Sequence, residues 1–121
     1  MPEFPAEDPN LERRRHLRVD LFQEIVCESG DVVTRSEVAD LSVGGMFIDM
    51  PRSPFARGMR VTVRFALRAD EPRIVVDADV HYAQDRIGIG VRFVDLTDAD
   101  REWIASFVEE HLRHHARALG L

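Results

Sequence analysis

Apolar and polar residues alternate along most of the chain, which is the pattern of β-strands that bury one face. The clearest example is residues 59–67. Its inward set is Met59, Val61, Val63, Phe65 and Leu67. The same period runs through residues 74–82 and 87–93, and it places Gly88 and Gly90 on the outer face of the last segment. We therefore predict three consecutive strands in this half of the chain.

Three further strands are predicted before residue 59, at residues 19–27, 32–41 and 46–50. Ser-Gly-Asp at residues 29–31 joins the first two as a hairpin, because these residue types favour tight turns. Six short strands joined mostly by tight turns indicate a mainly β fold. We expect a small six-stranded antiparallel β-barrel, closed or nearly closed, over residues 19–94.

After residue 94 the apolar spacing changes to that of an α-helix, which we predict over residues 98–119. Thr97 and Asp100 fit a capping box at its start, with Asp in place of the usual Glu. The apolar stripe of this helix consists of Trp103, Ile104, Phe107, Val108 and Leu112. Such a stripe needs a partner, and the sequence leaves two open: the end of the barrel or another protein.

Length and composition set the domain organisation. The 121 residues fit one domain, and a hydrophobic content of 45% supports a core without disulfides. Residues 1–12 hold three prolines and four acidic side chains, so we predict a flexible N-terminal arm before a domain of residues 13–121. Cys27 is the only cysteine, which excludes an internal disulfide and a cysteine-based zinc site, and we expect it in the core.

Charge and hydropathy narrow the possible partners. The net charge of −6 argues against general binding of nucleic acid or anionic membranes. No apolar run approaches the roughly 20 residues that span a bilayer, and the N-terminus lacks the apolar segment of a signal peptide. We expect a cytoplasmic protein without membrane insertion, either a monomer or a weak homodimer.

Two short stretches carry the candidate ligand chemistry. They contain Arg13, Arg14, Arg15 and Arg18, and then Asp40, Ser42, Gly44 and Gly45. About one hairpin separates them, so a strand pair would bring them to the same end of a sheet. Arginine forks match phosphates and the O6/N7 edge of guanine, and a carboxylate accepts from the N1–H and N2–H₂ edge. Together the groups favour a guanine nucleotide with several phosphates, although each stretch alone also fits a solvated basic segment or local turn chemistry.

These residues resemble the motifs of the PilZ family of cyclic di-GMP receptors. The first motif, R-x-x-x-R, is matched by Arg14 and Arg18. The second, [D/N]-x-S-x-x-G, is matched by Asp40, Ser42 and Gly45. The resemblance covers nearly the whole chain, because the strand GIGVRF followed by Asp-Leu and a helix is similar to the family's ending. It implies arginines that grip phosphates and guanine edges and stack on the bases, with the Asp and Ser binding from the barrel surface.

The resemblance also implies a function. A family member of this kind is a cyclic di-GMP receptor or adaptor that changes conformation on binding and signals to an effector protein. In the family, an arginine at the position of Arg13 tends to accompany two stacked cyclic di-GMP molecules. A nucleotide-independent interaction module of motility or pilus machinery is the alternative. A third hypothesis, a nucleic-acid-binding barrel, is disfavoured by the net charge.

Other candidate sites are weaker. We see no Ser/His/Asp arrangement and no phosphate loop, and we therefore expect no enzyme activity. His111 and His115 have a spacing that can hold a metal, but a third ligand is missing, so we place them on a solvated helix end and expect no metal. Tyr82 falls on the inward period of its strand and is expected in the core, although its ring would also suit a base.

Overall fold

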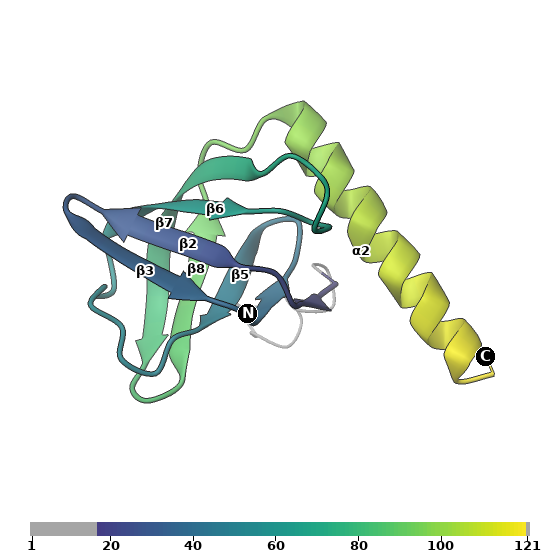
Figure 1. The fold of residues 1–121 in the computed structure, drawn as a ribbon, viewed down its shortest axis with the longest axis horizontal. Helices are drawn as coiled ribbons and strands as arrows, with labels where there is room; N and C mark the ends of the chain where they lie inside the picture. Colours follow the sequence, from purple (N-terminus) through teal and green to yellow (C-terminus); the bar gives the residue numbers. More distant parts are fainter. Residues whose placement is uncertain (1–16, 121) are drawn as a thin grey trace, which may run out of the picture.

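The structure is a computed structural model that describes residues 17–120. In chain order the described elements are β1 (Val19–Leu21), β2 (Ile25–Ser29), β3 (Val32–Ser36), β4 (Ala39–Leu41), β5 (Gly45–Asp49), β6 (Arg60–Phe65), β7 (Ile74–Gln84), β8 (Gly88–Phe93) and α2 (Asp98–Ala118). All the strands belong to one sheet that curls around a core, and α2 lies at one end of it (Figure 1).

Every neighbouring pair of strands in this sheet is antiparallel. The strand order is β1-β4-β5-β8-β7-β6-β2-β3, so β1 and β3 are its two ends. The chain passes from β1 into β2 and from β3 into β4, and each passage connects one end of the order with the other. These two connections bring the two ends of the strand order close together, so the sheet is strongly curled. The predicted antiparallel, mainly β fold with a C-terminal helix is confirmed.

The predicted number of six strands is wrong, because two of the predicted strands are each divided in two. Residues 19–27 form β1 and β2, and residues 32–41 form β3 and β4. A strongly curled sheet turns its corners where strands bend and exchange partners. Here β1 bonds to β4, whereas β2 bonds to β3 and β6. Leu21 and Ile25 lie on either side of the break and both are buried, so the alternation keeps its phase and conceals the corner.

The interior is filled by the inward residues of the strands, as the alternation predicts. In β6, for example, Val61, Val63 and Phe65 are essentially inaccessible, while the residues between them are partly exposed. Burial of this kind contributes roughly 1.5–3 kcal/mol for each large side chain, which makes the inner face the main source of stability. The same burial fixes the register of β5, β8 and β7, because a slip by one residue would turn the inward side chains of a strand to solvent.

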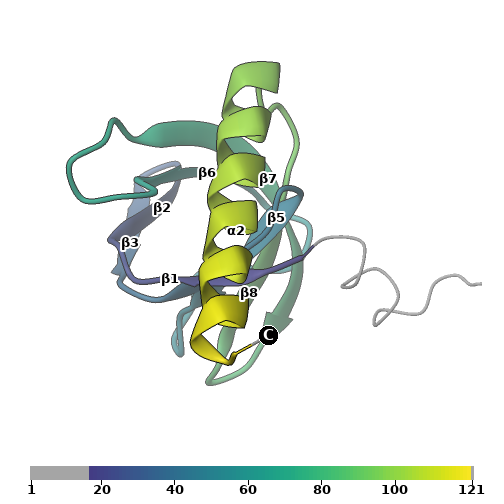
Figure 2. The same ribbon diagram turned by 90° about the vertical axis from the view of Figure 1, so that its right-hand side faces the viewer.

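The helix α2 begins at the predicted cap and packs on the end of the curled sheet. The hydroxyl of Thr97 accepts a hydrogen bond from the backbone N–H of Asp100 at 3.1 Å. The buried residues of α2 are Ile104, Phe107 and Val108, all in its first half. Figure 2 shows α2 passing across β1, which it contacts, so the first half of its apolar stripe is covered by the domain itself. Among the described residues, no helix is long and apolar enough to span a membrane.

Arg68, on the loop between β6 and β7, also holds α2 against the sheet. The guanidinium of Arg68 lies over the ring of Phe107, 5.1 Å from its centroid. The same side chain donates to the carboxylate of Glu110 at 2.6 Å. A cation over an aromatic face and a charged hydrogen bond both favour this one placement of the helix.

Candidate functional site: the outer face of β1, β4, β5, β8 and β7

The two sequence motifs meet where β1 pairs with β4. Asp20 lies opposite Asp40 in this pair, and Arg18 comes directly before β1. Arg18 Nη1 approaches Asp40 Oδ1 to 3.6 Å, which makes an ion pair but not a hydrogen bond. The Nε–H of Arg18 is buried and has no hydrogen-bond acceptor among the described residues. The structure thus brings the last residue of the first motif beside the first residue of the second.

Ser42 and Gly45 close the turn between β4 and β5. The backbone N–H of Ser42 donates to the carbonyl oxygen of Gly45 at 2.9 Å, and its hydroxyl donates to the same oxygen at 3.3 Å. Ser42 is only 2% exposed. A Cβ added at Gly45 would overlap the carbonyl oxygen of Val91, so this position requires glycine for close contact between β5 and β8. Both residues therefore shape the loop, and Ser42 has its hydroxyl engaged within it.

The remaining predicted site residues are placed as follows. Gly44 lies in the same turn, and its carbonyl oxygen accepts from the N–H of Phe93 at 3.0 Å, which ties the turn to the end of β8. Arg13, Arg14 and Arg15 lie outside the described residues, as does the predicted arm of residues 1–12. Of the four arginines, the structure thus positions Arg18.

A row of side chains extends from Asp40 across the outer face of the sheet. Direct partners in antiparallel strands share a face, so the register identifies the row. Asp40 lies opposite Phe47, Phe47 opposite Gly90, and Gly90 opposite Tyr82. The rings of Phe47 and Tyr82 are stacked at a centroid distance of 5.9 Å and an angle of 27°. A flat aromatic surface thus lies beside the carboxylate of Asp40.

Tyr82 reaches this surface because of a bulge in β7. The register shifts between Val80 and Tyr82, so that His81 and Tyr82 together oppose Gly90. One extra residue reverses the alternation, which turns Tyr82 from the core to the outer face. The expectation that Tyr82 lies in the core is therefore wrong. The predicted outward position of Gly90 is confirmed, and a Cβ there would overlap the ring of Tyr82.

Arg92 is a second cation on this face, and it belongs to neither sequence motif. It lies two residues from Gly90 on β8 and is exposed, so it belongs to the same outer face. It pairs in register with Gly45 at the end of the second motif and with Asp79 on β7. The sequence signal for Arg92 was its outward position in the GIGVRF strand, on the same face as the glycines predicted to point outward.

This face combines charged groups with aromatic rings, so it can bind a ligand through both ionic and stacking contacts. Arg18 and Arg92 offer guanidinium forks, Asp40 offers a carboxylate, and Phe47 with Tyr82 offers a ring surface. The histidines of α2 lie elsewhere: the His111 ring packs on Phe107 at 4.2 Å between centroids. Within residues 17–120, no three His, Cys, Asp or Glu side chains converge as metal ligands would.

Comparison with solved structures finds the same fold. Escherichia coli YcgR in complex with c-di-GMP superposes with a TM-score of 0.69 at 19% identity, covering 89% of this chain and 49% of that one. The PilZ domain of E. coli YcgR with c-di-GMP gives 0.65 at 16% identity, covering 89% of this chain and 98% of that one. The Bacillus subtilis inhibitor of motility MotI (DgrA) gives 0.68 at 15% identity, covering 84% of this chain and 52% of that one. The chain thus spans about half the length of MotI and of the longer YcgR structure.

Sequence comparison gives two further results. Among curated protein sequences, no significant match to the chain is found. A family profile, that of the PilZ domain, matches residues 12–110. This match covers both motifs, every strand and the first half of α2, and the chain belongs to the PilZ domain family.

Proposed function

We propose that this domain is a cytoplasmic receptor for cyclic di-GMP with no catalytic activity. The observation that carries the proposal is the approach of Arg18 to Asp40 at 3.6 Å, which joins a phosphate-binding group and a guanine-binding group at one edge of an outer face. Two structures with this fold are described as complexes with c-di-GMP, which supports the same ligand.

Each group of the face has a role in this proposal. Arg18, together with Arg13, Arg14 and Arg15, binds the phosphates, because several guanidinium forks match a dianionic ligand. Asp40 accepts from the N1–H and N2–H₂ edge of one guanine. The rings of Phe47 and Tyr82 provide a surface on which a base can stack. Ser42, Gly44 and Gly45 hold the loop in the shape that this requires.

The proposal includes a change of surface on binding and an effector protein that detects it. The ligand carries at least two negative charges to a protein whose net charge is −6, so the arginines must close around it for binding to be favourable. Arginines that close around the ligand in this way alter the surface next to β1. MotI is described as an inhibitor of motility, which supports regulation of another protein as the output.

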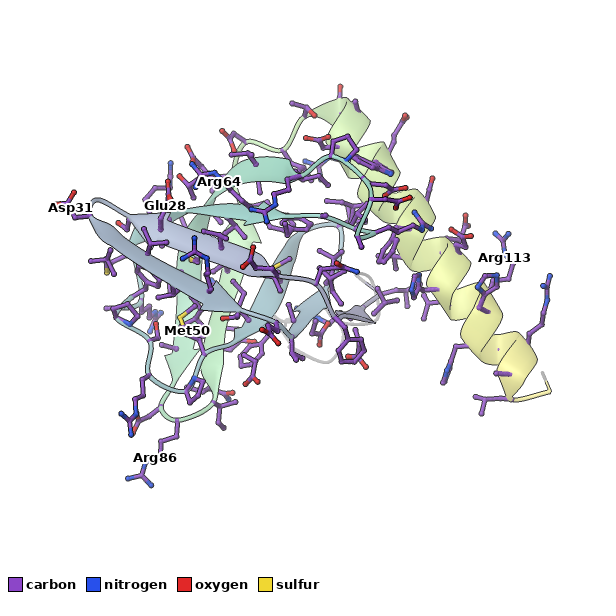
Figure 3. All side chains as sticks on the ribbon, in the orientation of Figure 1. Glu28, Asp31, Met50, Arg64, Arg86 and Arg113 are labelled. Carbon is purple, nitrogen blue, oxygen red and sulfur yellow. The ribbon has the colours of Figure 1, made fainter. Side chains whose placement is uncertain are left out.

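The test is a calorimetric titration of the full chain with cyclic di-GMP, cyclic di-AMP, GTP and a short oligonucleotide. Cyclic di-GMP should bind most tightly, and the oligonucleotide should not bind. Asp40→Ala should narrow the discrimination between cyclic di-GMP and cyclic di-AMP, because only guanine presents the donor edge that this carboxylate accepts. Asp31→Ala is the matched control, since Asp31 lies at the far tip of the β2–β3 hairpin (Figure 3).

The outcomes separate the hypotheses. No binding of cyclic di-GMP would leave the nucleotide-independent interaction module as the better explanation. An Asp40→Ala variant that loses affinity but keeps full discrimination would show that Asp40 only shapes the turn. Tight binding of the oligonucleotide would favour the nucleic-acid hypothesis.

A further inference from the structure

An apolar groove runs along α2 on the side that faces the nucleotide motifs. It has a volume of about 740 Å³. Its walls include Leu17 before β1, Val43 from the turn between β4 and β5, and Ala105, Val108 and Leu112 from α2. Leu17 directly precedes Arg18, and Val43 directly follows Ser42. The described residues 17–120 therefore form an apolar channel beside the ligand motifs.

Beyond Leu112, which packs against the core, α2 extends past the sheet. Figure 1 shows this part projecting beyond the strands, and none of its residues is buried. Leu112, Ala116 and Leu119 continue the apolar stripe at helical spacing, and Leu119 is 60% exposed. An apolar stripe that continues beyond the body of a domain is typical of a contact surface.

The two surfaces have similar lengths. The helical wall of the groove extends from Ala105 to Arg113, nine residues, and the projecting stripe extends from Leu112 to Leu119, eight residues. At a rise of about 1.5 Å from each residue to the next, these span roughly 12 Å and 10 Å. A second α2 lying antiparallel fits one surface onto the other.

Charge along α2 gives the direction of this pairing. Within the paired segment, residues 105–110 contain two acidic side chains, Glu109 and Glu110, and no basic one, whereas residues 111–118 contain two arginines, three histidines and no acidic side chain. Antiparallel helices set the acidic half of one against the basic half of the other, and parallel helices would set like against like. Arg113 marks the basic half in Figure 3.

We propose that α2 pairs with the α2 of a second copy of this chain, antiparallel, around a two-fold axis near Leu112. In this register Leu112 faces Leu112 of the partner, Val108 faces Ala116, and Ala105 faces Leu119. The acidic Glu109 faces His115. The same patch is used on both copies, as a two-fold interface requires, and the partner's helix lies against Leu17 and Val43.

The small size of this interface is typical of a weak dimer. Two helices in contact over about four turns bury less surface than the ~1,200 Å² of a standard interface, so the dimer should be weak. Sedimentation equilibrium of the full chain should show the mean mass rising from one chain toward two between roughly 5 and 500 μM. A wild-type chain that stays monomeric over this range would overturn the proposal.

A matched pair of variants tests the surface. Leu119→Asp should weaken dimerisation by at least about tenfold, because it puts a charge in the apolar groove near the acidic half of the partner. The control is Ile87→Asp, which makes the same change at a residue 51% exposed in the turn between β7 and β8. It should dimerise like the wild type. Equal weakening by both variants, or none by Leu119→Asp, would refute the pairing surface.

Disulfide trapping tests the direction. Ala105→Cys and Leu119→Cys chains, mixed under mild oxidation, should form mainly the 105–119 cross-link. The native cysteine will not interfere, because Cys27 is fully buried and burial raises the pKa of its thiol to about 12. A product dominated by 105–105 and 119–119 links would show parallel helices and contradict the proposal. Ile87→Cys chains measure the background from random collision.

Discussion

Replacement of Arg18 separates ligand binding from fold stability more sharply than any other change to the described part of the motifs. Arg18 lies at the junction of the two motifs and contacts Asp40 through one ion pair at 3.6 Å. Both side chains are partly exposed, at 31% and 42%. Arg18→Ala removes this ion pair and removes one guanidinium from the proposed phosphate site.

The structure gives different magnitudes for the two effects. A solvent-screened ion pair at this distance contributes less than about 1 kcal/mol to folding. A charged hydrogen bond to a phosphate that is left unmade costs about 1.5–3 kcal/mol of binding. Because about 1.4 kcal/mol corresponds to a factor of ten, the dissociation constant for cyclic di-GMP should rise roughly 10- to 150-fold. The variant should therefore fold normally and bind poorly.

The control is Arg64→Ala, which removes a stronger ion pair far from the site. Arg64 on β6 donates to Glu28 on β2 at 2.6 Å, and Figure 3 shows the two side chains pointing toward each other. This variant should lose more unfolding free energy than Arg18→Ala and should bind cyclic di-GMP like the wild type. Urea denaturation measures the first quantity and isothermal titration calorimetry measures the second.

Two results would refute this reasoning. Wild-type affinity in Arg18→Ala would show that the motif residue takes no part in binding. An equal loss of affinity in Arg64→Ala would show that only the overall charge matters, since both variants remove one positive charge. The crossed pattern, with stability lost in one variant and binding lost in the other, is the expected outcome.

Three further predictions follow from the site and its surroundings. Tyr82→Ala should weaken cyclic di-GMP binding by about 1–3 kcal/mol if a base stacks on the ring, and unchanged calorimetric affinity would exclude the aromatic surface from the site. The wild type should bind two cyclic di-GMP molecules at saturation, because four arginines can balance the phosphates of a stacked pair, and Arg13→Leu should shift the ratio toward one; native mass spectrometry counts the ligands, and a one-to-one wild-type complex would contradict this. The hydrogen bond from Arg64 holds the pKa of Glu28 below its ordinary value of 4.5, so this pair stabilises the fold above that pH and ceases to do so as the pH falls through the lowered pKa. The difference in unfolding free energy between wild type and Glu28→Gln, measured in urea, should therefore be present at pH 7 and absent in strong acid. A difference that persists in strong acid would show that it arises from packing and not from the ion pair.

Local patterns in the sequence were sufficient for much of this protein. The inward faces of β6 and β8, the helix with its Thr97 cap, and the positions of Asp40 and Ser42 at the end of a strand all follow from spacing along the chain. The reason is that alternation and capping depend on residues only a few positions apart. The approach of Arg18 to Asp40 was predictable as well, because a hairpin returns the chain to its starting end.

Tertiary structure decided the features that depend on curvature and register. The corner within residues 19–27 preserves the phase of alternation, so the local pattern does not reveal it, whereas the corner within residues 32–41 shifts the inward phase between Ser36 and Ala39. Both corners exist because a small sheet must bend to enclose its core. The bulge at His81 reverses that phase and moves Tyr82 to the outer face, where it meets Phe47 from a strand some 35 residues earlier. The sequence also left open whether the apolar stripe of α2 packs on the sheet or on another protein, because that too depends on tertiary structure. A stripe shows which face of a helix is apolar, but how much of it the domain covers depends on where the sheet ends, and here it ends near Leu112.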